Sequence, residues 1–221
     1  MIRRTLLIAA MAFPALAQMP TAPPASPPPT TTDVVITTSL GPITIALETQ
    51  RAPVTAGYIL KHVDERRLDG GTFYRAYKVL PDASVALIQG GIRDGRKLLP
   101  PVPHEPTTTT GLTHNDGAVS LARGAPGTAQ AQFFISIGDL SSLDANPAKS
   151  GDNVGYAVFG RVIAGMDVVR AILNAPISAT LGDAGMKGQM IAAPVPIISV
   201  KRVIPLPPVK AARKRPLPKR R

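Results

Sequence analysis

Between about residues 33 and 204 the chain consists mainly of short apolar runs separated by turn residues. In the segment 43–48 every second residue is apolar, which is typical of a strand with one buried face. A Leu-Gly-Pro turn at 40–42 joins it to the apolar run 34–38, so the pair predicts a hairpin. Further strands are predicted at 85–89, 118–122, 132–137, 156–163 and 197–203.

Two segments instead carry apolar residues at the spacing of a helix. The first begins at Pro53, a residue suited to the first turn, and continues to about Arg67 with charged residues on its other face. The second covers 166–173, with Asp167 near its positively polarised end. Many short strands with two helices predict a mainly β fold, a closed antiparallel barrel whose open ends the helices cover.

The first residues have the order of features of an export signal. Arg3 and Arg4 precede an apolar run at 6–13 and the small-residue site Ala15-Leu16-Ala17. We expect residues 1–17 to be a signal peptide cut after Ala17, which places the mature chain in a periplasm or outside the cell; a buried helix is the alternative. No segment has the length of a membrane span, so no transmembrane segment is expected in the mature chain.

The formal net charge of +11 comes from the ends of the chain. Residues 201–221 hold nine Lys and Arg and no acid, and two more arginines lie in the signal, so the remaining 14 basic residues balance the 14 acids. Residues 33–200, nearly all of the body, are therefore neutral, and Lys201 and Arg202 at its end give 33–204 a net charge of only +2. The proline-rich segment 18–32 is expected to be an extended linker. The basic, proline-rich tail at 205–221 is expected to be disordered and either binds an anionic surface or only aids solubility.

Composition and motifs exclude several kinds of site. The absence of cysteine excludes disulfides, thiol catalysis and Cys-ligated metals, and no Walker loop, GxSxG elbow or HExxH motif occurs. His62 is expected on the surface of the first helix. A Ser–His–Asp triad could be imagined from His114, Asp116 and Ser120, but residues so close in sequence rarely converge on one point. An enzyme of this sequence is expected to work without a nucleophile, metal or cofactor.

Short glycine- and aromatic-containing motifs run through the body in a definite order. They lie at 52–55, 69–75, 88–91, 117–123, 132–135, 143–144, 155–162 and 165–169. This ordered set, which spans essentially 33–204, resembles the cyclophilin family of peptidyl-prolyl cis-trans isomerases in an exported, bacterial form. The resemblance implies a closed eight-stranded antiparallel β-barrel capped by two α-helices. It also implies isomerisation of Xaa-Pro bonds in folding exported proteins, with a proline-binding chaperone or scaffold of little turnover as the alternative.

Such a reaction fits a chain without the usual catalytic motifs. Rotation about a peptide bond faces a barrier of about 18–20 kcal/mol, which arises from the double-bond character of the C–N bond. A pocket for the proline ring, and a donor to the nitrogen that has lost resonance in the twisted amide, lower this barrier without a covalent step. An arginine suits the donor's role because it is always charged and presents fixed donors.

The resemblance also assigns roles to individual residues. It implies that Arg75 is the catalytic arginine and that Gln89 orients it and contacts the substrate backbone. It implies a proline pocket lined by Phe134 and Leu143, while Tyr156 stands at the position of the family's usual histidine. The substrate-binding residues that it implies are Leu87, Ala122, Arg123, Gln132, Phe134, Leu143 and Tyr156.

Some positions depart from the family pattern. Ala86 stands where most members carry an aromatic, which implies a ring missing from the pocket wall and weaker proline binding. The segment 76–85 is longer than usual, and Tyr77 or Leu80 in it could refill that space. Ser142 stands where cyclosporin-sensitive members have tryptophan, so weak or absent inhibition is expected. Because the arginine is retained, isomerase activity is expected. The other departures could lower the rate or change the substrate preference.

Overall fold

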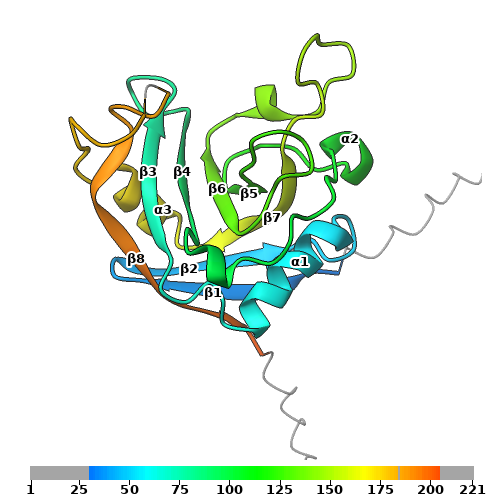
Figure 1. Cartoon of the computed structure of the whole chain (residues 1–221), viewed down its shortest axis with the longest axis horizontal. Helices are drawn as coiled ribbons and strands as arrows, with labels where there is room; N and C mark the ends of the chain where they lie inside the picture. Colours follow the sequence, from blue (N-terminus) through cyan, green and yellow to red (C-terminus); the bar gives the residue numbers. More distant parts are fainter. Residues whose placement is uncertain (1–29, 184, 205–221) are drawn as a thin grey trace, which may run out of the picture.

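The computed structural model describes residues 30–183 and 185–204; the predicted signal peptide, most of the linker and the basic tail lie outside them. The strands are β1 (Thr32–Thr38), β2 (Gly41–Leu47), β3 (Thr72–Lys78), β4 (Ala86–Gly91), β5 (Ala118–Leu121), β6 (Gln132–Ile137), β7 (Ala157–Ala164) and β8 (Met190–Arg202). They close into one antiparallel barrel in the order β1-β2-β7-β5-β6-β4-β3-β8 (Figure 1). The predicted eight-stranded barrel is confirmed.

The β1–β2 hairpin shows how alternation fills the barrel. Val34 faces Ile45 and Ile36 faces Ile43 across the two strands, and all four side chains are buried in the main core. The turn requires glycine at Gly41, where φ is +131° and a Cβ would lie 2.9 Å from the Val168 side chain. The neighbouring strands add inward-facing residues in the same way, so the barrel is a packed core rather than a channel.

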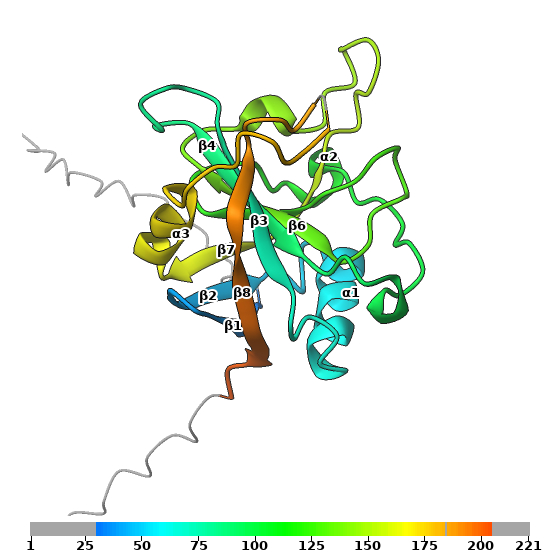
Figure 2. The ribbon, with the colours of Figure 1, turned by 60° about the vertical axis from the view of Figure 1, so that its left-hand side comes forward.

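Helix α1 (Pro53–Asp64) covers one end of the barrel, and α3 (Met166–Leu173) lies on the opposite side (Figure 2). α1 has no capping side chain at its own N-cap; instead the Glu105 carboxylate accepts hydrogen bonds from the amides of Val54 and Thr55, at 3.2 and 2.5 Å. A carboxylate at this end also meets the positive pole of the helix. A third, single-turn helix that the sequence did not predict, α2 (Thr107–Thr110), follows shortly after Glu105.

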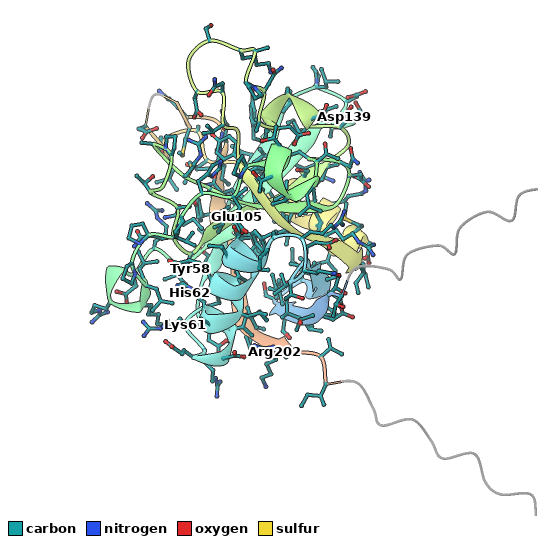
Figure 3. All side chains as sticks on the ribbon, turned by 90° about the vertical axis from the view of Figure 1, so that its right-hand side faces the viewer. Tyr58, Lys61, His62, Glu105, Asp139 and Arg202 are labelled. Atoms are coloured by element: carbon teal, nitrogen blue, oxygen red, sulfur yellow. The ribbon has the colours of Figure 1, made fainter. Side chains whose placement is uncertain are left out.

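His62 on α1 is fully buried, contrary to expectation. Its Nδ1 lies 3.0 Å from the carbonyl oxygen of Tyr58, and the two rings meet edge to face at 4.6 Å (Figure 3). The Tyr58 hydroxyl in turn donates to the Leu99 carbonyl at 3.3 Å, so a loop covers this side of the helix. α1 also ends earlier than predicted, at Asp64, because Arg66 adopts a left-handed backbone with φ of 54°.

Two strands differ from the predictions by more than a residue or two at an end. No strand is predicted over β3, because the adjacent aromatic residues Phe73 and Tyr74 break strict alternation; in the structure both are buried, and the register shifts between Phe73 and Arg75. β8 begins at Met190 rather than 197, through a stretch whose prolines argue against a strand. In the described ranges no helix is long and apolar enough to cross a bilayer.

Candidate functional site

A groove of about 290 Å³ lies over the outer face of β3, β4 and β6. It is lined by Arg75, Tyr77, Leu87, Gln89, Ala122, Arg123, Phe134, Leu143, Tyr156 and Met186. The structure therefore brings together eight of the nine residues predicted for the site. The ninth, Gln132, does not line the groove but is linked to it by a hydrogen bond from the Tyr74 hydroxyl.

The floor of the groove is built by strand register. Arg75 faces Gln89 across β3 and β4, and Gln89 faces Phe134 across β4 and β6. Two residues further along β3, Tyr77 faces Leu87 of β4 and forms a second row of side chains beside the first. Because side chains alternate between the two faces of a strand, these rows all point out of the barrel while their neighbours point into the core.

A bulge in β3 decides that Arg75 belongs to this floor. Phe73 faces Gly90 and points into the core, so regular alternation would send Arg75 inward as well. Instead Arg75 faces Gln89, and the extra residue Tyr74 lies at the shift in register. A bulge of this kind reorients the side chains that follow it.

The polar side of the groove is a chain of hydrogen bonds. Nη1 of Arg75 donates to Oε1 of Gln89 at 2.8 Å, and Nε2 of Gln89 donates to the Tyr74 hydroxyl at 2.8 Å. The Tyr74 hydroxyl donates to Oε1 of Gln132 at 2.6 Å. On its other side Arg75 donates from Nε and Nη2 to Oε1 of Gln189, at 2.8 and 2.6 Å. The guanidinium is thus fixed from two sides.

Arg75 keeps its charge in this setting. Burial lowers the pKa of its guanidinium, and the nearby Tyr74, Tyr156 and Tyr77 partly oppose this shift, but an arginine in a protein remains protonated. Within residues 30–183 and 185–204 no carboxylate forms an ion pair with it. The groove therefore presents a positive charge that is held by neutral amides.

The apolar side of the groove centres on Phe134. Its side chain is buried with Leu87 and Leu140, and Leu143 and Tyr156 pack against them. The Tyr156 ring meets Phe134 edge to face at 5.5 Å. The preceding Phe133 points the other way, into the main core. This arrangement offers apolar contact to a small ring such as that of proline.

A buried polar array supports Phe134 from behind. The His114 ring stacks on Phe134 at 5.7 Å, its Nδ1 lies 2.5 Å from Asp144 and its Nε2 lies 3.0 Å from the Ser120 hydroxyl. The expectation that His114, Asp116 and Ser120 do not converge is wrong for His114 and Ser120, which are in contact, and holds for Asp116, whose carboxylate accepts from the amide of Gly138. Ser120 is fully buried, so the array does not present a nucleophile to the groove. Burial lowers the pKa of His114, against the opposing effect of the hydrogen bond to Asp144.

The rim at Ala122 and Arg123 is held by local contacts. The amide of Ala122 donates to the Gln132 carbonyl at 2.9 Å, which ties the rim to β6. Arg123 forms an ion pair with Asp152 at 2.8 Å and its guanidinium lies 4.9 Å from the centre of the Tyr156 ring. Its side chain is 99% buried by these contacts, so it stiffens the groove wall rather than extending into solvent.

The predicted effect of Ala86 is corrected by the structure. Ala86 is fully buried in the main core and does not line the groove, because it lies on the same face of β4 as Ile88. The groove instead contains Tyr77 from the longer segment, whereas Leu80 is 45% exposed and does not line it. The alanine therefore leaves no gap in the groove wall.

Sequence patterns did not indicate a role in the groove for Tyr74, Met186 or Gln189. Tyr74 stands at a bulge, and the segment that carries Met186 and Gln189 has no periodic pattern and lies far from Arg75 in the chain. Only the pairing of β3 with β8 brings them together. No group of three His, Cys, Asp or Glu side chains suited to a metal ion occurs in the part of the chain that the structure describes.

Comparison with known proteins agrees with this geometry. The sequence profile described as "Cyclophilin type peptidyl-prolyl cis-trans isomerase/CLD" matches residues 33–202. A peptidyl-prolyl cis-trans isomerase of Acinetobacter baylyi is 36% identical over 171 residues, which cover 76% of this chain and 84% of the relative. The isomerase cyp18 of Streptomyces antibioticus is 35% identical over 154 residues, or 67% of this chain and 87% of the relative.

Solved structures show the same fold. A cyclophilin-type isomerase of Cryptosporidium parvum superposes with a TM-score of 0.60 at 19% identity, covering 80% of this chain and 100% of the other. A second structure of that protein, determined in the presence of the dipeptide Ala-Pro, gives a TM-score of 0.61 at 20% identity, covering 78% and 99%. With the family profile and the close relatives, these findings show that the chain belongs to the cyclophilin-type family of peptidyl-prolyl cis-trans isomerases.

Proposed function

We propose that the groove binds Xaa-Pro segments of extended or unfolded chains and that Arg75 is the residue that lowers the barrier to their isomerisation. The observation that carries this proposal is the guanidinium beside Phe134's apolar cluster, which is held by the amides of Gln89 and Gln189 and forms no ion pair with a carboxylate of the described residues. Such a site combines a place for a proline ring with a fixed cationic donor.

The proposed mechanism is electrostatic. When the amide twists, the proline nitrogen loses resonance and its lone pair becomes able to accept a hydrogen bond from Arg75. The interaction exists only in the twisted state, so it lowers the barrier rather than strengthening ground-state binding. Phe134 and Leu143 would hold the ring, and each 1.36 kcal/mol of selective stabilisation gives about a tenfold rate.

A protease-coupled isomerisation assay on a short Xaa-Pro peptide tests this role. We expect Arg75→Ala to reduce kcat/KM by about 100-fold, and Arg75→Lys to recover little because a lysine lacks the planar, fixed donors. Arg96→Ala is the matched control, since Arg96 is 90% exposed, does not line the groove and pairs with the neighbouring Asp94. An Arg75→Ala variant as active as the wild type would contradict the proposal. Near-background rates for both proteins would favour the binding-only alternative, which the comparisons do not support.

We further propose that the isomerase is exported in a bacterium and acts on exported proteins as they fold. The arginines, apolar run and Ala-x-Ala site of residues 1–17 support this proposal. N-terminal sequencing of the protein from a periplasmic fraction should read from Gln18. Deletion of residues 2–17 should leave the protein in the cytoplasm; unchanged export of that variant, or a periplasmic protein that retains Met1, would contradict it.

The tail at 205–221 is proposed to bind an anionic surface. It carries seven Lys and Arg and no acid, and such a charge run is attracted to acidic head groups or polymers. Vesicles with acidic lipid should sediment the full chain at low salt and release it as salt rises, because screening shortens the reach of exposed charges to about 8 Å at 0.15 M. Binding that persists after deletion of 205–221 would refute this assignment.

A further inference from the structure

Between α3 and β8 the chain passes beside β3 (Figure 1). This segment places the side chain of Gln189 against Arg75. We propose that Gln189 is a positioning residue of the isomerase, which holds the Arg75 guanidinium in the orientation needed to reach the proline nitrogen. This inference rests on the proposed role of Arg75. It concerns a residue more than a hundred positions away in sequence.

The backbone of Gln189 is anchored beside the residue that its side chain holds. Its carbonyl oxygen accepts a hydrogen bond from the amide of Ala76 at 2.9 Å, directly after Arg75. Its own amide donates to the Met186 carbonyl at 3.0 Å, and Gly188 adopts a positive φ of 76° at the preceding position. The side chain is tied as well, since Nε2 lies 3.4 Å from the Gly185 carbonyl. These bonds place Oε1 in a fixed position.

Counting donors shows what Gln189 does to the arginine. A guanidinium has five N–H donors. Gln189 accepts from Nε and from one hydrogen of Nη2, and Gln89 accepts from one hydrogen of Nη1. Each terminal nitrogen therefore keeps one N–H that has no partner among the described residues. The two glutamines fix the plane of the group and leave this pair of donors for the substrate.

The chemistry of an amide suits this task better than a carboxylate. Both would accept the two bonds from Nε and Nη2, but a carboxylate would pair with the positive charge and weaken its interaction with the proline nitrogen. An amide oxygen orients the group and leaves it a net cation. A Gln189→Glu variant is thus expected to keep the arginine in place and still lose rate.

The same turn also forms part of the groove wall, because Met186 lines it. Asp183 anchors the turn through its carbonyl, which accepts from the amides of Met186 and Lys187 at 3.0 and 2.8 Å. Lys187 is exposed and does not line the groove, so it provides a matched control for changes within this segment.

The test compares Gln189→Met, Gln189→Glu and Lys187→Met in the full mature chain. Methionine has a similar length but no amide oxygen, so we expect kcat to fall about tenfold, with KM and Tm near the wild-type values. The ¹H–¹⁵N signal of the Arg75 Nε should be sharp in the wild type and in Gln189→Glu, and broadened in Gln189→Met. Lys187→Met should leave all four measurements unchanged.

A double-mutant cycle with Arg75→Ala separates this inference from the proposal on which it rests. If Gln189 acts through the arginine, Gln189→Met should have no further effect on the residual rate of Arg75→Ala. Equal losses in both backgrounds, or a Gln189→Met variant with wild-type kcat and an unchanged Nε signal, would overturn the positioning role alone. Full activity of Arg75→Ala would overturn the role of the arginine itself.

Discussion

Ala86→Phe distinguishes the core side of β4 from its groove side. Ala86 is fully buried, with Lys78 facing it on β3 and Ile137 on β6, and it belongs to the main core. A phenyl ring added there has no open space to enter, and overpacking of this kind costs about 1–3 kcal/mol. In a domain of this size each kcal/mol lowers Tm by about 2–4 °C, so a fall of about 2–12 °C is expected. The kcat/KM of the folded enzyme should stay within about twofold.

Thermal melting followed by circular dichroism, with the protease-coupled assay at 10 °C, measures both effects on one protein. Leu87→Phe is the matched control, since Leu87 is the next residue of the same strand and lines the groove. This control should change KM, because its ring meets the substrate, with a smaller effect on Tm. A higher kcat/KM for Ala86→Phe at an unchanged Tm would refute the reasoning, since it would require residue 86 to face the proline site.

Four other outcomes are expected. Leu143→Ala should raise KM about fivefold with a smaller change in kcat, because part of the apolar contact to the proline ring is lost; a change in kcat alone would contradict its place in the pocket. Burial lowers the folded-state pKa of His62 and of His114, so the unfolded chain takes up protons first, and stability should be full above about pH 6.5 and fall as the pH drops below that value. Tm measured from pH 8 to pH 5 should show this fall, and a flat profile would oppose it. Deletion of residues 205–221 should leave peptide turnover unchanged, and a large loss would show that the tail docks near the groove. Cyclosporin should inhibit weakly or not at all because Ser142 is exposed and short; potent inhibition in a titration of the isomerase would mean that this loop is wrongly aligned with the family.

Several features of the site could be predicted because they depend on local pattern. Alternation along β6 requires Phe133 and Phe134 to face opposite sides, and the family motif indicated which one faces the groove. The motif around Arg75 and the motif around Gln89 lie on consecutive strands that pair with each other. Their order along the chain was therefore enough to predict that the two residues lie close together. The hairpin of β1 and β2 likewise follows from apolar positions of period two.

Other features depend on how distant segments pair. Alternation from Phe73 would have sent Arg75 into the core, and the bulge at Tyr74, which depends on the partners of β3, turns it to the groove. The face of Ala86 was misjudged because motif alignment gives position along a strand and not the side on which a residue lies.

The sequence by itself determined the barrel, the family and most of the residues around the groove: the barrel follows from short-range periodicity, and the family and the groove residues follow from the resemblance that motifs in a definite order carry. Only the tertiary structure decided that Asp144 rather than Asp116 meets His114, and that Gln189 holds Arg75. The physical reason is that a side-chain hydrogen bond forms over about 3 Å in space, whatever the separation in sequence. Closure of the barrel sets the distances between these side chains, and they cannot be predicted from any local pattern in the sequence.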